Sequence, residues 1–399
     1  MGDTVKEMAL PFLLRRVELR NYRSIEHCDV ELGPLMFLVG PNGSGKSNFL
    51  DALRFVSDCL TTSVDEAIRA RGGFKALCRQ GNSDFSIKLT LDHGNLGTAE
   101  YFLEIAGGPK RSFEIAKEAC QLTGALGSTI EGYKRHLGSV TTSLPSGIHS
   151  LYDDEPNPPP SSDRLYLSAL AGWPMFGLIH RFLSTMAFYN PLTAPMRDYQ
   201  SQDRGSRLTP NASNLASVFK TTRETHPDWA ERIFQYLSAA IPRLRQIVDV
   251  EVGERITLQF TEASIDGSDR TFYASNMSDG TLRMLAILLA LFQRSEQKTS
   301  LVGIEEPEMG VHPAAAEVLF DSLNEASAFR QILVTSHSSE LLDHDNVDAD
   351  SLLAVSAESG STIIGPIDDR QKTILKKKLG TAGELLRRDL LQPNELSHK

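Results

Sequence analysis

The chain has 399 residues, of which 41% are hydrophobic and 23% are charged. This is the composition of an ordinary globular protein, long enough for two or three domains, and it excludes global disorder. The formal net charge of −10 excludes a protein that coats nucleic acid through its overall charge, so any DNA contact needs a local basic patch.

Cysteine content and hydropathy limit the class of protein further. The four cysteines form no CxxC pair, which argues against a disulfide framework and a cysteine zinc site. The most apolar run is 285–292, whereas a membrane span needs about 20 residues. The N-terminus has no apolar signal core. We therefore expect a cytoplasmic protein without a membrane partner.

The first quarter of the chain has the pattern of a sheet interrupted by one helix. Apolar residues alternate or run continuously in five segments that we expect to be strands: 12–19, 28–32, 35–39, 86–91 and 101–105. The run at 35–39 is apolar throughout, as in a strand buried on both faces. Residues 47–60 instead have the period of an amphipathic helix.

A glycine-rich turn lies between strand 35–39 and this helix. It reads Gly40-Pro41-Asn42-Gly43-Ser44-Gly45-Lys46-Ser47 and matches G-x-x-x-x-G-K-[ST]. Glycines let the backbone wrap phosphates, and the loop N–H groups and the helix N-terminus then face the anion. Lys46 is expected to neutralise phosphate charge and Ser47 to bind Mg²⁺. The predicted nucleotide contacts are Asn42, Gly43, Gly45, Lys46, Ser47 and Asn48.

The periodic signal weakens over 107–185, which we interpret as an insertion, partly helical. Its stretch 153–163 is rich in proline and acidic residues and is expected to be an exposed loop. Further along, a helix is expected over 228–241 and a hairpin over 247–260. A β-α-β unit is expected from three segments: 300–304, 313–327 and 331–335.

Two of these later strands end in side chains that carry chemistry. Glu305 and Glu306 end an apolar strand, and His337 follows the next one. Ligand groups in parallel sheets sit at the carboxyl ends of strands. Glu305 is expected to hold Mg²⁺ through water, and Glu306 to polarise the attacking water as general base. His337 is then expected to sense the γ-phosphate and to hold either the water or Glu306 in place.

Upstream, Ser278-Asp279-Gly280-Thr281 precedes the apolar helix 284–292. One interpretation of Ser278 is a plain helix N-cap. The other is an anion site, in which Ser278 and the Gly280 N–H at a helix N-terminus bind phosphate.

These four elements, in this order, resemble the ATP-binding cassette (ABC) ATPases. More narrowly, they resemble the RecF/SMC/Rad50-like branch and its compact bacterial AAA-family, OLD-like members. The resemblance covers 12–106 and 186–345. It implies an α/β P-loop NTPase fold with a mixed sheet, a helical lobe and an insertion. The expected parts are the N-terminal half of the ATPase head (1–106), the insertion (107–185), the C-terminal half (186–365) and a basic helical tail (366–399).

The resemblance also implies partners and further site residues. Two heads would sandwich two ATP molecules, with Ser278 and Gly280 of one head contacting the γ-phosphate held by the other. Arg23, in the opening turn Asn21-Tyr22-Arg23-Ser24, would approach the nucleotide. Gln80 is the nearest candidate for the glutamine that joins the metal site, and an exposed loop residue is its alternative.

The chain departs from the family pattern in three respects. Glu305 stands where aspartate is usual, and Ser-Asp-Gly-Thr stands where Ser-Gly-Gly is usual. No heptad run supports a coiled-coil arm. Only 62 residues follow His337, so we expect no Toprim nuclease domain in this chain.

Three functions follow from these features. The first is a nucleotide-switched homodimer that acts on DNA in repair or anti-phage defence. The second is a regulatory ATPase that controls a separately encoded effector protein, such as a nuclease, without binding DNA. The third, a transporter subunit, is disfavoured by the long insertion. Three basic clusters are candidate DNA contacts or plain solvated faces: Arg15/Arg16/Arg20/Arg23, Arg69/Arg71/Lys75/Arg79, and Lys372/Lys376/Lys377/Lys378 with Arg387/Arg388.

Overall fold

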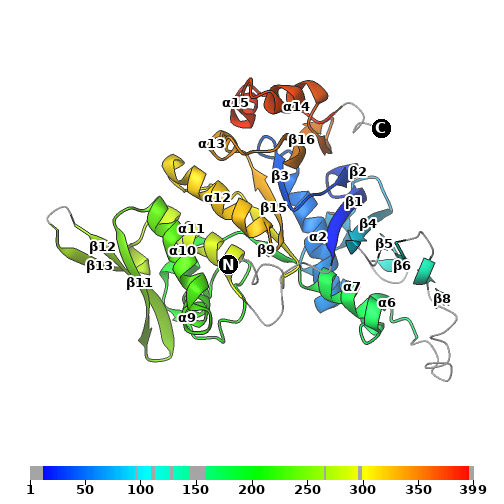
Figure 1. The fold of residues 1–399 in the computed structure, drawn as a ribbon. Helices are drawn as coiled ribbons and strands as arrows, with labels where there is room; N and C mark the ends of the chain where they lie inside the picture. The colour runs from blue at the N-terminus through cyan, green and yellow to red at the C-terminus, as the bar shows by residue number, and fades with distance from the viewer. Residues whose placement is uncertain are drawn as a thin grey trace. The chain divides into compact units, whose positions relative to one another are not determined.

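The computed structural model describes residues 12–94, 97–108, 113–125, 129–137, 139–143, 159–264, 267–294 and 299–394. The chain forms two compact units (Figure 1). Unit 1 contains the described residues of Met1–Met186, Asp350–Arg370 and Leu391–Lys399, and unit 2 those of Ala187–Ala349 and Gln371–Leu390. None of the helices in the described ranges combines the length and hydropathy that crossing a bilayer requires.

The strands of unit 1 lie in the order β8-β7-β6-β5-β4-β1-β2-β17-β16-β3. Their bounds are β1 (Leu13–Tyr22), β2 (Ile25–Glu31), β3 (Leu35–Val39), β4 (Asp84–Asp92), β5 (Thr98–Ala106), β6 (Glu114–Thr123), β7 (Thr129–His136), β8 (Ser139–Ser143), β16 (Leu352–Glu358) and β17 (Ser361–Pro366). β16 and β17 pair in parallel with β3 and β2, whereas β1, β2 and β4–β8 pair antiparallel. The predicted α/β fold with a mixed sheet is confirmed, and β3 has the bounds that its apolar run predicts.

The predicted insertion, 107–185, continues this sheet instead of leaving it. β6, β7 and β8 extend it beyond β5, and two helices follow, α6 (Tyr166–Ala169) and α7 (Pro174–Ser184). Sequence analysis missed β6 and β7 because charged residues occupy inward positions in both strands. Glu118 on β6 and Arg135 on β7 are buried and lie 3.8 Å apart, so the strands lack plain apolar alternation. Residues 153–158 of the proline-rich stretch lie outside the described residues.

Helix α2 (Lys46–Thr61) is the core helix of unit 1. It begins directly after the glycine-rich turn and buries an apolar face that includes Phe49, Leu53 and Val56. This face packs against β1, α7 and α3 (Val64–Arg69), and α3 in turn contacts the short α4 (Phe74–Leu77). Apolar burial therefore fixes the helix N-terminus at the end of β3.

Unit 2 has a parallel sheet of β9 (Ala187–Tyr189), β14 (Leu301–Glu305) and β15 (Gln331–Ser336). The predicted β-α-β unit is confirmed, with α12 (Ala316–Ser327) between β14 and β15. The predicted helix over 228–241 is α10 (Pro227–Ala240). The remaining helices and strands are α8 (Thr193–Arg197), α9 (Leu215–Thr225), α11 (Asp279–Phe292), β10 (Gln200–Ser201), β11 (Leu244–Val252), β12 (Arg255–Ala263) and β13 (Asp269–Tyr273).

Helices α9, α10 and α11 lie beside the antiparallel sheet of β11, β12 and β13 in Figure 1. Contacts between α9 and α10, and between each of them and β11, hold this part together. The predicted hairpin over 247–260 is confirmed as β11 and β12, which turn at Gly253 with φ of 61°. The ring of the half-buried Tyr236 stacks on the buried Phe292 and joins α10 to α11.

The C-terminal segment contributes to both units, so the unit boundaries differ from the predicted domains. Residues of Asp350–Arg370, including β16 and β17, belong to unit 1, whereas Gln371–Leu390 belongs to unit 2. The tail is helical, with α14 (Asp369–Lys376) and α15 (Ala382–Arg387). α15 packs on α13 (Ser339–Leu342), and Arg387 makes an ion pair with Asp343.

Candidate nucleotide site

The glycine-rich turn in unit 1 has the backbone of an anion cradle. Gly43 and Gly45 have φ of 79° and 106°, a conformation that glycine adopts without strain. Gly45 is the N-cap of α2, so no side chain caps this helix N-terminus. The Ser44 hydroxyl is buried and has no hydrogen-bond partner among the described residues. The turn therefore fits a phosphate group.

The Lys46 side chain is 4% exposed and folds back over the turn. Its Nζ donates hydrogen bonds to the carbonyl oxygens of Gly40 (2.8 Å) and Pro41 (2.9 Å). A phosphate would offer this ammonium group a stronger, charged acceptor than these two carbonyls. The predicted contact of Lys46 with phosphate stays a prediction.

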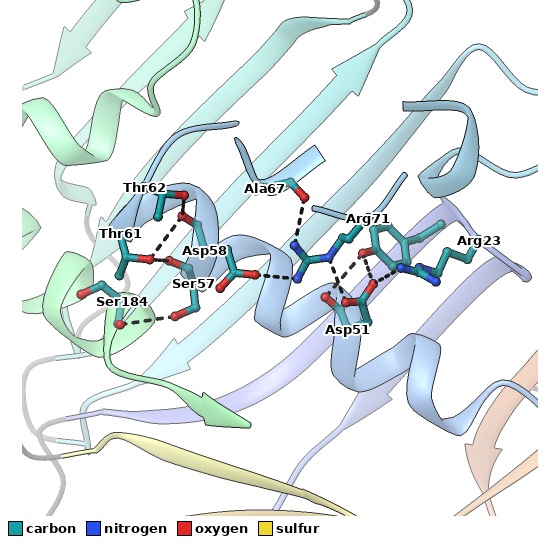
Figure 2. A network of polar contacts seen from close by, with 10 residues as sticks. Arg23, Asp51, Ser57, Asp58, Thr61, Thr62, Ala67, Arg71 and Ser184 are labelled. Atoms are coloured by element: carbon teal, nitrogen blue, oxygen red, sulfur yellow. Dashed lines mark hydrogen bonds and ion pairs between the residues drawn. The ribbon is translucent and has the colours of Figure 1, made fainter. Parts of the chain in front are cut away.

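Arg23 forms an ion pair with an acidic residue of α2, Asp51. Its Nη2 lies 2.9 Å from Oδ2 of Asp51, whose Oδ1 accepts from Arg71 Nε, also at 2.9 Å (Figure 2). The Tyr22 hydroxyl donates to Asp51 as well, at 2.8 Å. Arg23 has φ of 52°, a left-handed backbone that is uncommon outside glycine. The prediction that Arg23 approaches the nucleotide stays a prediction.

Asn48 is predicted to contact the nucleotide and Gln80 to join the metal site, and both assignments stay predictions. Asn48 Nδ2 donates to the hydroxyl of Ser24 at 2.6 Å, which holds the opening turn against α2. Gln80 is exposed in the loop that follows α4. The neighbouring Arg79 instead makes contacts in this loop: its guanidinium donates hydrogen bonds to Ser24 O and Gly360 O and forms an ion pair with Glu26.

In unit 2, the ends of β14 and β15 bring Glu306 and His337 together. Glu306 Oε1 lies 3.3 Å from His337 Nδ1. Glu306 has φ of 44°, and its N–H donates to Thr335 O at 3.0 Å. The parallel register, with Glu305 opposite Thr335, sets both side chains at one sheet edge. The expected glutamate–histidine pairing is present here.

A second glutamate, Glu308, holds the histidine segment. Its Oε1 accepts from the Ser336 hydroxyl at 2.7 Å and from the His337 N–H at 3.2 Å. Its Oε2 is buried and has no hydrogen-bond partner among the described residues. The sequence offered a signal for Glu308, because it ends the same acidic run as Glu306.

Arg283 of α11 fixes the other side of Glu306. The Arg283 side chain is buried, and its guanidinium donates to Pro191 O (2.8 Å) and to Glu306 O (3.3 Å). Burial lowers the pKa of Arg283. Sequence analysis missed this residue because its partners are backbone carbonyls from distant segments.

The segment Ser278-Asp279-Gly280-Thr281, called the signature turn below, lies at the N-terminus of α11. Ser278 is the N-cap, and its hydroxyl accepts from the Thr281 N–H at 3.2 Å, so the capping interpretation is confirmed. A Cβ on Gly280 would stand 2.3 Å from Gly310 O, so this glycine allows close packing of the two loops. Asp279 is paired with Arg197 of α8, 2.6 Å apart. The anion interpretation stays a prediction.

Three residues are predicted to hold Mg²⁺, and besides Gln80 these are Ser47 and Glu305, which lie in separate elements. Ser47 lies in the first turn of α2 in unit 1, and Glu305 ends β14 in unit 2. Across the described part of the chain, no group of three or more His, Cys, Asp or Glu residues could hold a metal by itself. A hydroxyl and a carboxylate are each oxygen ligands of the kind that Mg²⁺ prefers.

Comparison with known proteins finds two family descriptions that match parts of the chain. Residues 13–121 match the family described as "AAA ATPase domain". Residues 230–343 match the one described as "AAA domain, putative AbiEii toxin, Type IV TA system". The first match contains the glycine-rich turn, and the second contains the signature turn, Glu306 and His337.

Among curated relatives, the OLD nuclease of Thermus scotoductus is 22% identical over 84% of this chain and 61% of its own length. The DNA replication and repair protein RecF of Phocaeicola vulgatus is 38% identical over 16% of this chain and 18% of the relative. The chain thus spans about three fifths of the OLD nuclease.

Among solved structures, an SMC head bound to the C-winged helix domain of ScpA has a TM-score of 0.53 to this chain. It is 13% identical and covers 90% of this chain and 99% of that one. At this identity the likeness shows the fold alone. The chain is therefore similar in sequence to AAA ATPase domains and to the OLD and RecF proteins, and similar in fold to SMC heads.

Proposed function

We propose that the chain binds ATP with Mg²⁺ and hydrolyses it to ADP and phosphate. Lys46 neutralises phosphate charge, and Ser47 holds the metal together with Glu305, which acts through water. Glutamate at 305 is one methylene longer than the usual aspartate, a difference that a bridging water accommodates. When bound, Mg²⁺ would screen the negative charge that develops on the transferred phosphoryl group.

In this proposal Glu306 takes the proton of the attacking water, and His337 holds its carboxylate. The observation that carries the proposal is the 3.3 Å contact between Glu306 Oε1 and His337 Nδ1 at the ends of adjacent parallel strands. The backbone of Glu306 is held from both sides, by Thr335 and by Arg283. A carboxylate fixed in this way is oriented before the substrate arrives.

We propose further that two copies close head-to-tail around two ATP molecules, and that hydrolysis releases the dimer. Ser278 and Gly280 of one copy would contact the γ-phosphate held by the other. Support comes from the position of both residues at the N-terminus of α11, a 14-residue helix whose N–H groups favour an anion. The nucleotide would then act as a switch between separate and paired chains.

The cellular process proposed for this switch is DNA repair or anti-phage defence. The RecF relative is named as a DNA replication and repair protein, and the OLD relative as a nuclease. Both names belong to those proteins, and only the proposal extends a DNA-related role to this chain.

A second candidate is a regulatory ATPase that controls a separately encoded effector, such as a nuclease, without binding DNA. The observation that favours it is the ion pairing within the predicted basic clusters. The paired side chains are Arg16 with Asp29, Arg23 with Asp51, Arg69 with Asp65, Arg71 with Asp51 and Asp58, Arg79 with Glu26, and Arg387 with Asp343. Arginines neutralised by neighbouring acids contribute little to phosphate binding.

The first experiment is steady-state ATPase activity with and without linear double-stranded DNA, with Glu306→Gln as the blank. A DNA-stimulated rate that collapses with added salt supports action on DNA. A rate indifferent to DNA supports the effector-controlling ATPase, and copurification of a second polypeptide that is lost in Lys46→Ala would then identify the effector. No ATPase activity above the blank contradicts both.

The dimer is tested separately with Glu306→Gln at saturating ATP and micromolar protein. Sedimentation velocity should show a dimer with ATP and a monomer without it, because the slowed hydrolysis keeps the ATP-bound state. Lys46→Ala in the same background should stay monomeric. A Glu306→Gln chain that remains monomeric with ATP contradicts the head-to-tail dimer.

A further inference from the structure

The glycine-rich turn (residues 40–47), which is proposed to bind phosphate and is called the phosphate-binding turn below, packs against a hairpin near the C-terminal end of the chain. β16 pairs in parallel with β3, with Leu353 opposite Leu38 and Ala354 opposite Val39. The two strands of the hairpin, β16 and β17, turn tightly at Ser359 and Gly360, which have φ of 49° and 80°. This pairing places the start of β17 beside the turn that leaves β3.

Two glycines of the phosphate-binding turn are required by this hairpin. A Cβ on Gly40 would stand 2.0 Å from Val355 O, and a Cβ on Gly45 would stand 2.1 Å from Thr362 Oγ1. Real Cβ atoms do not approach other atoms so closely. These glycines therefore serve packing against β16 and β17 as well as the approach of a phosphate.

The hydroxyl of Thr362 lies at the centre of a chain of hydrogen bonds. Thr362 is 2% exposed, and its Oγ1 donates to Ser44 O at 2.8 Å. A hydroxyl has one hydrogen, so the 2.7 Å contact with Ser24 must be donated by the Ser24 hydroxyl. Ser24 Oγ in turn accepts from Asn48 Nδ2 at 2.6 Å.

This series of hydrogen bonds fixes the orientation of the Ser44–Gly45 peptide in the phosphate-binding turn. The C=O and N–H of a trans peptide point in opposite directions. Because Thr362 holds Ser44 O, the N–H of Gly45 in the same peptide points to the side away from Thr362. Gly45 has φ of 106°, so the backbone could rotate here if the carbonyl were released.

We propose that Thr362 is a positioning residue for nucleotide binding, which orients the Ser44–Gly45 peptide so that its N–H faces the phosphates of a nucleoside triphosphate. The hairpin of β16 and β17 is then part of the nucleotide site, although Thr362 touches no phosphate. This inference rests on the proposed binding of ATP at the turn. It explains why Asn48, on α2, and Ser24, in the opening turn, form one series of hydrogen bonds that ends through Thr362 at Ser44 O.

The test compares Thr362→Val with Thr362→Ser. Valine keeps the shape but removes the donor, which leaves Ser44 O unpaired, and serine restores the donor. The matched control is Thr185→Val in unit 1, which removes another buried threonine hydroxyl that donates to a carbonyl, Arg181 O, at 2.7 Å. Equilibrium binding of a fluorescent ATP analogue to the full chain is measured by anisotropy, and KM and kcat are measured for ATP.

We expect Thr362→Val to weaken analogue binding and raise KM about tenfold, with kcat changed by less than about threefold. Thr362→Ser should bind within about twofold of the parent, and so should Thr185→Val. Wild-type affinity in Thr362→Val overturns the inference, and so does equal weakening in Thr362→Val and Thr185→Val.

Two further variants keep the test decisive. If Thr362→Val does not fold, Thr362→Ala removes the same hydroxyl donor with a smaller side chain, and unchanged analogue binding in that variant overturns the inference. Lys46→Ala separates this inference from the proposed function. If the parent binds the analogue no better than Lys46→Ala, the proposed ATP site itself fails, whereas a parent that binds well alongside an unaffected Thr362→Val rejects the positioning role alone.

Discussion

The guanidinium of Arg197 holds the carboxylate of Asp279, with Nη2 2.6 Å and Nε 3.2 Å from Oδ1. Nη1 of the same arginine donates to Ser275 O at 2.9 Å, just before the signature turn. An aspartate in this turn brings negative charge to a loop that is proposed to face phosphate. Arg197, 82 residues earlier in the chain, compensates that charge and explains how the turn tolerates the acid.

Removing Arg197 should therefore impair ATP-dependent pairing. In the Glu306→Gln background, Arg197→Ala leaves Asp279 uncompensated and is expected to weaken the ATP-bound dimer by about tenfold, because like charges then face each other across the interface. Adding Asp279→Gly should restore the dimer. The dimer is followed by sedimentation velocity over a series of protein concentrations. If the double variant forms an ATP-bound dimer as weak as that of Arg197→Ala, then Arg197 does more than neutralise Asp279.

The same pair predicts a pH effect. The hydrogen bond from Arg197 holds the pKa of Asp279 below its ordinary value of 3.8. A carboxylate with a lowered pKa in the folded chain adds stability above its unfolded pKa and loses it as the pH falls through the folded pKa. Arg197→Ala should raise the Asp279 midpoint toward 3.8 in a carbon-detected NMR titration. Arg16→Ala is the control, because it should move the midpoint of its partner Asp29 and leave that of Asp279 unchanged.

Glu308 is expected to act through His337. Glu308→Ala removes the acceptor for Ser336 and for the His337 N–H, so kcat for ATP should fall by about tenfold or more with little change in KM. Glu308→Gln keeps one oxygen acceptor and should retain most of the activity. Glu317→Ala, an exposed glutamate in the first turn of α12, is the control. If kcat and KM change by the same factors in Glu308→Ala and in the control Glu317→Ala, this role of Glu308 is contradicted.

Much of this fold was predictable because its signals are local. The apolar run Leu35–Val39, the glycine-rich turn and the period of α2 follow one another within 27 residues, 35–61. The ends of β14 and β15 likewise carried Glu306 and His337, and parallel pairing brought them together.

What the sequence concealed depends on pairing over long separations. Thr362 supports a carbonyl 318 residues away, and no local pattern marks such a contact. β6 and β7 were missed because buried Glu118 and Arg135 satisfy each other and the segment 159–167 instead of following apolar alternation. Glu118 accepts from the Tyr166 and Leu167 N–H groups, and Arg135 donates to Ser161 O and Arg164 O. The pairs Arg16–Asp29, Arg23–Asp51 and Arg387–Asp343 were hidden for the same reason.

Gly280 should not tolerate a side chain. A Cβ there would lie 2.3 Å from Gly310 O, a backbone atom that cannot move aside alone. Gly280→Ala is expected to lower the free energy of unfolding by about 1–3 kcal/mol and to abolish the ATP-dependent dimer of the Glu306→Gln chain. Urea unfolding and sedimentation velocity measure the two effects. Gly172→Ala, where a Cβ meets nothing within 4 Å, should change neither, and a harmless Gly280→Ala would contradict the close packing of the two loops.

Asp51 should be the most sensitive acid of α2, because Arg23, Arg71 and Tyr22 all donate to it. The Arg71 side chain is 6% exposed, so Asp51→Ala would leave a buried guanidinium short of an acceptor and should lower the free energy of unfolding by about 3 kcal/mol. Asp51→Asn keeps one oxygen acceptor and should lower the free energy of unfolding less than Asp51→Ala does. Asp58 is 40% exposed and pairs with Arg71 alone among these three donors, so Asp58→Ala should have the smaller effect. Urea unfolding followed by circular dichroism compares them, and equal losses in the two alanine variants would contradict the central role of Asp51.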